Sequence, residues 1–109
     1  MTMVRQPGER ELRSLVLGVL ARREAYGYEV AAQLRGITEG RDLAEGSVYP
    51  ILRRLERDRL ASSHWVEIGV GVPRRRYYLL TPKGIAAFAR QQSLRPSAPS
   101  ARRLGELRP

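Results

Sequence analysis

The most informative pattern of apolar and polar residues lies in GSVYPILRRLERDR, residues 46–59. At about 3.6 residues per turn, one side of a helix over this segment is apolar and the other is basic. The apolar side comprises Val48, Ile51, Leu52 and Leu55. The basic side comprises Pro50, Arg53, Arg54 and Arg57. The pattern predicts a helix that packs against a core through one face and presents the other to a polyanion.

Pro50 limits where this helix begins, because a proline in a helix interior loses a backbone hydrogen bond and clashes with the preceding turn. A start near Gly46 or Ser47 keeps Pro50 in the first turn, where proline is tolerated. Ser47 is then the expected cap. An earlier start with a kink at Pro50 is the alternative.

Helical spacing of apolar residues predicts three further helices, over residues 9–23, over 28–35 and from Pro82 to about residue 94 or 95. A turn is expected at 25–27. Thr81 followed by Pro82 is a helix-start signal, with Thr81 as the cap, and Pro96 should end the last helix.

Between the third and the last helix the period changes to that of strands. Residues 60–68 and 75–80 are rich in β-branched and aromatic residues, and the intervening GVGVPR carries two glycines and a proline, so together they predict a hairpin. Three helices, a two-stranded ribbon and a helix form the layout of a winged helix-turn-helix. We therefore predict a mainly α fold with a small β-ribbon in one domain, residues 9–95. A flexible arm, 1–8, and a disordered basic tail, 96–109, are expected to flank it.

Composition adds a strong positive charge to this picture. Among 109 residues, Lys and Arg total 20 against 11 Asp and Glu, a formal charge of +9. Such a balance favours a nucleic acid or an anionic membrane as partner. Lys83 is the only lysine, and the guanidinium groups that make up the excess suit bidentate contacts to phosphate or guanine. A basic surface without a specific partner is the alternative.

Other classes of function find little support. The absence of cysteine removes disulfides and thiolate sites, and no apolar run has the length of a signal peptide or a membrane span, so a cytoplasmic protein without a membrane partner is expected. His64 is the only histidine. Gly69 and Gly71 open no helix and form no phosphate-binding fingerprint, and the carboxylates are scattered. We expect no enzyme activity, no metal and no cofactor.

Several motifs together resemble the PadR family of bacterial transcriptional regulators. They are YGYEVAAQL (26–34), GSVYPILRRLERDRL (46–60), a strand containing Trp65, and RRRYYLLTPKG (74–84). The most specific element is Tyr-Pro followed by Leu-Arg-Arg-Leu-Glu, and the resemblance covers residues 12–90. It implies a homodimeric repressor in which the third helix reads operator DNA, the wing holds the backbone, and the first and last helices dimerise.

The expected DNA-binding residues lie on the third helix, on the wing and at the start of the second helix. Matches to the family motifs supply Ser47, Tyr49, Pro50 and Arg53 in the groove, Tyr28 near a phosphate, and Arg75 and Arg76 on the wing. The basic helix face and the wing cluster add Arg54, Arg57 and Arg74. Alternatives remain for some of them: Tyr49 packing on the wing, Tyr28 in the core, and Arg54 and Arg57 solvated or paired with Glu56 and Asp58.

Dimerisation is expected through Leu17, Leu20 and Ala21 of the first helix and Ile85, Phe88 and Ala89 of the last. Many family members have a longer C-terminal helix. Because the last helix predicted here is short, the apolar second face of the first helix is expected to matter more for dimerisation. The alternative is that the second apolar face of the first helix is buried within the monomer.

A two-fold dimer favours an inverted-repeat operator with half-sites roughly 34 Å apart. Some family members are similar in binding planar aromatic compounds, so a small aromatic effector is a further expected partner. Trp65 packs within the wing or contributes to an effector pocket. The second hypothesis for function is a winged-helix module that binds an acidic protein partner, because fold does not fix function.

Overall fold

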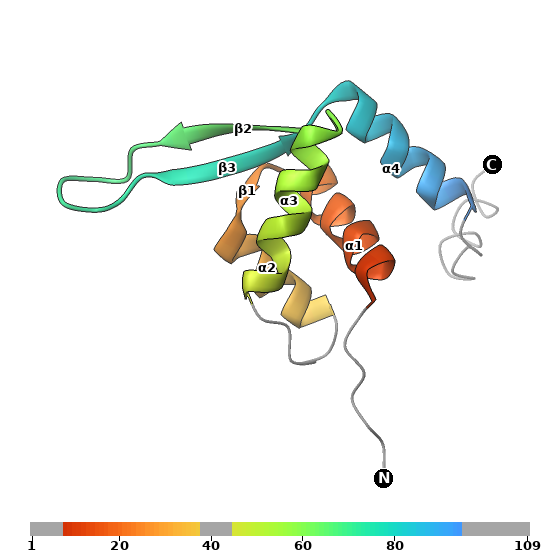
Figure 1. Ribbon diagram of the computed structural model, residues 1–109, viewed down its shortest axis with the longest axis horizontal. Helices are drawn as coiled ribbons and strands as arrows, with labels where there is room; N and C mark the ends of the chain where they lie inside the picture. Colours follow the sequence, from red (N-terminus) through yellow and green to blue (C-terminus); the bar gives the residue numbers. More distant parts are fainter. Residues whose placement is uncertain (1–7, 38–44, 95–109) are drawn as a thin grey trace, which may run out of the picture.

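The computed structural model describes residues 8–37 and 45–94 of the chain. The predicted tail and all but Gly8 of the predicted arm lie outside these ranges. Three helices are followed by a β-hairpin and a fourth helix (Figure 1). The elements are α1 (Glu9–Arg22), β1 (Ala25–Tyr26), α2 (Gly27–Ile37), the 3-10 turn η1 (Glu45–Ser47), α3 (Val48–Arg57), β2 (Ala61–Val66), β3 (Arg75–Leu80) and α4 (Pro82–Leu94).

The fold is a winged helix, as predicted, with one addition to its sheet. The hairpin of β2 and β3 projects from the helices as the wing (Figure 1), and β1 pairs with the other edge of β3 to give the antiparallel order β1-β3-β2. Ala25 lies opposite Tyr78 and Tyr26 opposite Tyr77. The turn expected at residues 25–27 was therefore wrong. Two residues are too few to show the alternation typical of a strand. Only their pairing with β3 identifies them as a strand.

The start of α3 corrects a second prediction. Ser47 has helical backbone angles, φ −71° and ψ −23°, and makes no side-chain cap hydrogen bond. The cap is lost because η1 continues the helical conformation backwards through Ser47, whereas an N-cap needs extended backbone at that residue. Pro50 lies in the first turn of α3, as predicted.

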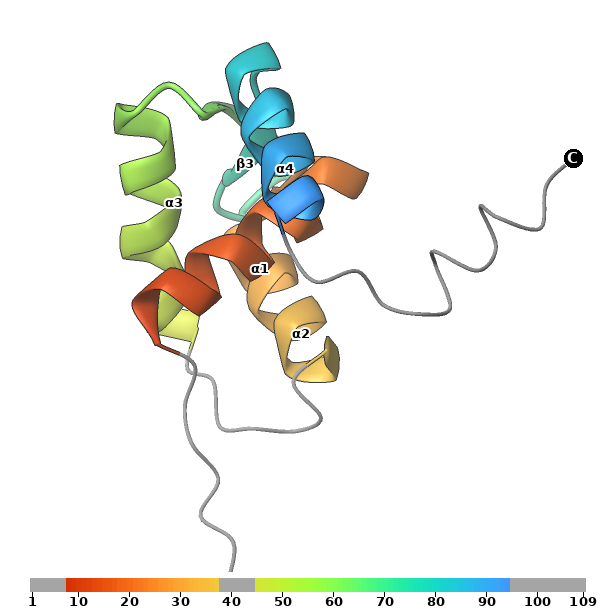
Figure 2. The same ribbon diagram turned by 90° about the vertical axis from the view of Figure 1, so that its right-hand side faces the viewer.

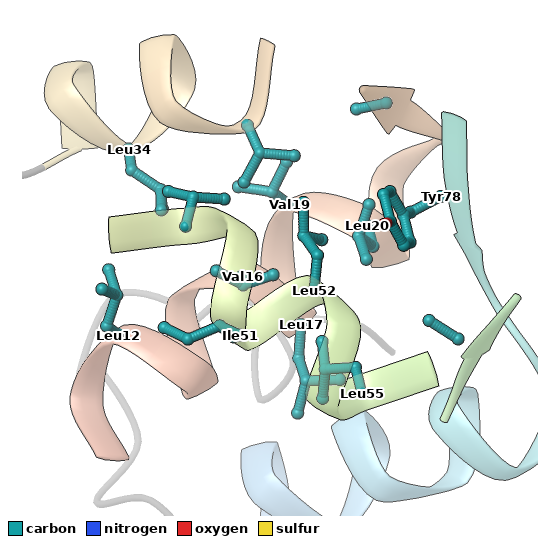
Figure 3. Close-up of a cluster of buried hydrophobic side chains, with 14 of the residues drawn as sticks. Leu12, Val16, Leu17, Val19, Leu20, Leu34, Ile51, Leu52, Leu55 and Tyr78 are labelled. Carbon is teal, nitrogen blue, oxygen red and sulfur yellow. The ribbon is translucent and has the colours of Figure 1, made fainter. Parts of the chain in front are cut away.

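The core lies between α1, α2 and α3, and the base of the wing closes it. All four apolar residues predicted for α3 are buried, and they pack against α1 and α2 (Figure 3). Burying each such side chain contributes about 1.5–3 kcal/mol. The core comprises Leu12, Val16, Leu17, Val19, Leu20, Ala25, Val30, Ala31, Leu34, Val48, Ile51, Leu52, Leu55, Leu60, Ala61 and Tyr78.

Burial also decides between the two interpretations of the second apolar face of α1. Leu17 is 1% exposed and Leu20 is 3% exposed, and both belong to the core of the monomer. Their assignment to a dimer contact is therefore wrong. The reason is that α1 is central: α4 lies against it (Figure 2), while α2, α3 and β3 cover its other sides. Ala21 remains exposed.

Hydrogen bonds join the start of α4 to the end of α3. Thr81 Oγ1 accepts from the backbone N–H of Gly84 at 3.0 Å, which confirms Thr81 as the cap, and donates to the carbonyl of Arg59 at 2.6 Å. A Cβ at Gly84 would overlap the carbonyl oxygen of Leu60 and lie 2.9 Å from its carbonyl carbon. Glycine at this position allows α4 to lie directly against the first residues of the wing.

Among the described helices, none has both the length and the apolar character needed to cross a bilayer.

Candidate nucleic-acid interface

The outward face of α3 carries the basic residues that its sequence pattern predicts. Pro50, Arg53 and Arg57 are exposed. Arg54 is different, because its Nη1 forms an ion pair with the carboxylate of Glu9 at the start of α1. The alternative pairing of Arg54 with a neighbour on its own helix is therefore wrong. Two guanidinium groups of this face, those of Arg53 and Arg57, have no ion-pair partner among the described residues.

A hollow of about 400 Å³ lies between α3, the start of α2 and the wing. Arginine and aromatic side chains make up most of its wall, and among the described residues that line it none is acidic. A cavity with this lining attracts anions. The lining residues are Tyr26, Gly27, Tyr28, Tyr49, Arg53, Trp65, Arg74, Arg75, Arg76 and Tyr78.

Tyr49 joins α3 to the start of α2. A Cβ at Gly27 would lie 2.7 Å from Cζ of Tyr49 and closer still to Cε1, so the tyrosine ring rests directly on the glycine. Tyr49 thus packs on α2 and lines the hollow together with wing residues. Tyr28 is 52% exposed, which excludes the alternative that placed it in the core.

Aromatic rings orient the guanidinium groups of the wing. The Cζ of Arg75 lies 4.6 Å from the ring centroid of Tyr26, and that of Arg74 lies 4.8 Å from Trp65. Each contact contributes about 0.5–1 kcal/mol at an exposed site. Trp65 therefore contacts an arginine of the wing and also lines the hollow, so both of its interpretations remain predictions.

Arg76 makes a different set of contacts from its neighbours. Its Nη2 donates to Glu56 Oε1 of α3 at 3.0 Å, and its Nε donates to Ser63 Oγ of β2 at 2.9 Å. Ser63 Oγ in turn donates to Glu56 Oε2 at 2.7 Å. Burial raises the pKa of Tyr78 in the same region, against the opposing effect of the Arg76 charge.

A further contact ties the wing to the segment that follows α1. His64 Nε2 of β2 lies 2.5 Å from Glu24 Oε1. This pair accounts for the single histidine through a contact within the fold. Among the described residues, no group of three His, Cys, Asp or Glu side chains is arranged to hold a metal ion.

Comparison with known proteins assigns the family. Residues 16–90 match the model of the transcriptional regulator PadR-like family. The chain belongs to the PadR-like family. Members of this family are DNA-binding transcription regulators and not enzymes.

Solved PadR structures share the fold. A PadR-like transcription factor from Bacteroides fragilis is 30% identical, with a TM-score of 0.70 over 90% of this chain and 86% of that one. A PadR family regulator from Clostridium difficile is 30% identical, with a TM-score of 0.66 over 75% and 83%. Bacillus subtilis PadR, solved in complex with operator DNA, is 20% identical and has a TM-score of 0.71 over 84% of this chain and 51% of that one.

The surface predicted to join two PadR protomers lies along α1 and α4. Ile85 is 57% exposed and Ala89 is exposed, while Phe88 is half-buried and packs on the core. Beside Phe88 lies a hollow of about 180 Å³ between α1, the end of α2 and α4. Four of the six residues predicted for dimerisation therefore remain at a surface: Ala21, Ile85, Phe88 and Ala89.

Sequence reasoning missed three residues that position the side chains of this candidate interface. Tyr26 supports Arg75, Gly27 accommodates Tyr49, and Glu56 holds Arg76. The first two lie inside the motif YGYEVAAQL, which drew attention to Tyr28 alone. Glu56 is 20 residues from Arg76 along the chain, and no local pattern indicates that the two meet.

Proposed function

We propose that this PadR family regulator is a repressor that binds an inverted-repeat operator as a homodimer, through α3 and through Arg74 and Arg75 of the wing. The observation that carries the proposal is the hollow between α3, α2 and the wing, which has an arginine and aromatic wall and is continuous with the exposed face of α3. Bacillus subtilis PadR has the same fold and has been solved with operator DNA, which supports DNA as the partner.

The proposed contacts separate into base readers and phosphate binders. Tyr49 and Arg53 line the hollow at the N-terminal half of α3, and Ser47 and Pro50 lie beside them, so this group enters the major groove. The phosphate binders surround it and provide affinity that does not depend on sequence. They are Tyr28, Arg54, Arg57, Arg74 and Arg75. Arg54 shares its charge with Glu9, and we expect its contribution to be the smallest.

The proposed dimer uses α1 and α4. Ile85 and Ala89 form an exposed apolar stripe on α4, and Ala21 lies at the exposed end of α1. The proposal requires a two-fold axis along this surface with both α3 helices on one side of the dimer. Half-sites are then expected roughly 34 Å apart, one helical turn of DNA.

The test is selection of bound sequences from genomic fragments, followed by titration of the best fragment across a salt series. The affinity should fall as salt rises, with a slope in log–log form of about 0.9 for each phosphate contacted. The selected sites should contain an inverted repeat and should repress a reporter gene. A slope near zero, or fragments without any shared motif, would refute the proposal. Repeating the titration with planar aromatic acids tests for an effector.

A further inference from the structure

We propose that Arg76 positions the wing and does not bind DNA. Together with Glu56 and Ser63 it forms a clamp that sets the angle between the wing and the recognition helix. We name these three residues the α3–wing clamp. The inference refines the proposed function and rests on it only for the effect on DNA binding, since the clamp itself exists without DNA.

The clamp is a closed ring of hydrogen bonds across three elements. Glu56 belongs to α3, Ser63 to β2 and Arg76 to β3. Both carboxylate oxygens of Glu56 are used, one by Arg76 at 3.0 Å and the other by Ser63 at 2.7 Å. The third side runs from Arg76 Nε to Ser63 Oγ, at 2.9 Å. Because each member contacts the other two, the ring resists rotation of the wing about its base.

Aromatic rings enclose the guanidinium of Arg76 further. Its Cζ lies 5.6 Å from the ring centroids of both Trp65 and Tyr78. Tyr78 is part of the core, so the clamp lies against a buried residue of the fold. Arg75, the preceding residue, stacks on Tyr26 and has no acidic partner among the described residues. The two adjacent arginines therefore have different roles.

Charge supports the same assignment. Paired with Glu56, the guanidinium of Arg76 has little net charge to offer a phosphate. If Arg76 moved to DNA, it would leave the carboxylate of Glu56 unpaired on the recognition helix, close to the negative backbone. The arrangement therefore favours retention of the clamp in the bound state.

The first experiment measures the clamp without DNA. The chain contains no cysteine, so Asp58→Cys at the end of α3 and Val70→Cys at the wing tip introduce two sites for spin labels. Both positions are exposed. The distribution of distances between the labels should be narrow in the otherwise unchanged protein and broader when Arg76→Ala or Ser63→Ala is added. Arg75→Ala is the matched control and should leave the distribution unchanged. Equal widths in all four proteins would overturn the proposal.

The second experiment measures binding to the selected operator across a salt series. Arg75→Ala should lower the salt slope by about 0.9, the value for one lost phosphate contact. Arg76→Ala and Ser63→Ala should each weaken binding by roughly 2- to 10-fold, the range for the loss of one hydrogen bond, while the slope stays the same. Glu56→Ala removes a negative charge from α3, which by itself would strengthen DNA binding. The clamp predicts the opposite result, weaker binding, because the wing loses its contact with α3.

Two results of this second experiment would overturn the proposal. One is a drop of about 0.9 in the slope for Arg76→Ala combined with no effect of Ser63→Ala. The other is tighter binding by Glu56→Ala. Ser63→Ala removes only a hydroxyl group, so it provides the answer if Arg76→Ala fails to fold. If the unaltered protein binds no DNA at all, the proposed function fails, while the label distances still test the clamp.

Discussion

Gly27 lies at the start of α2 and supports the ring of Tyr49, so replacing it should affect DNA reading more than stability. An added Cβ would lie 2.7 Å from Cζ of the ring, whereas ordinary contacts begin near 3.4 Å. The nearest ring atom, Cε1, would lie closer still, so the ring must move by roughly 1 Å, because close-packed atoms cannot overlap. The movement is away from Gly27, and because the ring lines the hollow, the shape of the hollow changes with it.

The free energy of unfolding should change little in Gly27→Ala. Turning the Tyr49 ring away from its preferred rotamer costs about 0.5–1.5 kcal/mol. Replacing glycine by alanine in a helix contributes up to about 1 kcal/mol in the opposite direction. The two effects nearly cancel, and thermal unfolding should show a shift of only a few degrees.

Discrimination between operator and non-operator DNA should fall much more. One lost base contact costs about 1–3 kcal/mol, which corresponds to roughly a 5- to 150-fold loss of specificity. Competition binding with the selected operator and a scrambled duplex measures this directly. Tyr49→Ala should produce the same loss, and the double variant should be no worse than either single one, because both changes remove one contact.

Gly36→Ala is the matched control, since a Cβ at this position of the same helix meets nothing within 4 Å. It should raise stability by up to about 1 kcal/mol and leave DNA binding unchanged. Unaltered specificity in Gly27→Ala would show that Tyr49 does not read bases. Loss of folding in Gly27→Ala would show that the ring cannot move as we infer.

Three further predictions concern bases, packing and assembly. Arg53→Ala should relax base preference, while Arg75→Ala should weaken all sequences alike; equal effects in competition binding would refute this division. Gly84→Ala should lower the free energy of unfolding by about 1–3 kcal/mol in denaturant titration, because the new methyl group overlaps the backbone of Leu60 and not a mobile side chain. An unchanged free energy of unfolding would contradict the close contact between Gly84 and the backbone of Leu60. Ile85→Glu, at a 57% exposed position, should dissociate the dimer in sedimentation analysis without loss of helix content, and a persisting dimer would place the interface elsewhere.

Helical periodicity predicted the fold well because the core of this chain is built from regular stripes. Each α3 residue assigned to the apolar side is buried, and Thr81 caps α4 as its pairing with Pro82 indicated. The wrong predictions concern residues whose local sequence pattern is overridden by contacts with a neighbouring element. Ser47 satisfies the rule for a cap, but η1 extends the helix past it. Leu17 and Leu20 satisfy the rule for a second apolar face, but α1 is covered on several sides.

The DNA-binding residues were harder to predict than the fold, because the sequence does not show which arginines form ion pairs with carboxylates of other elements. A sequence shows each positive charge but not the carboxylate that reaches it from another element. Two arginines that the pattern assigned to DNA are paired in this way, Arg54 with Glu9 of α1 and Arg76 with Glu56 of α3. Both partners are distant along the chain.

Three of the arginines without such partners among the described residues lie together in the fold. Arg53, Arg74 and Arg75 line the same hollow, and rings of Trp65 and Tyr26 lie beneath the last two. A guanidinium group that already rests on a ring loses less side-chain entropy when it meets a phosphate. Paired arginines must first give up a carboxylate, so they add less than their charge suggests. The strength of DNA binding should therefore follow the number of supported, unpaired guanidinium groups and not the total positive charge of the chain.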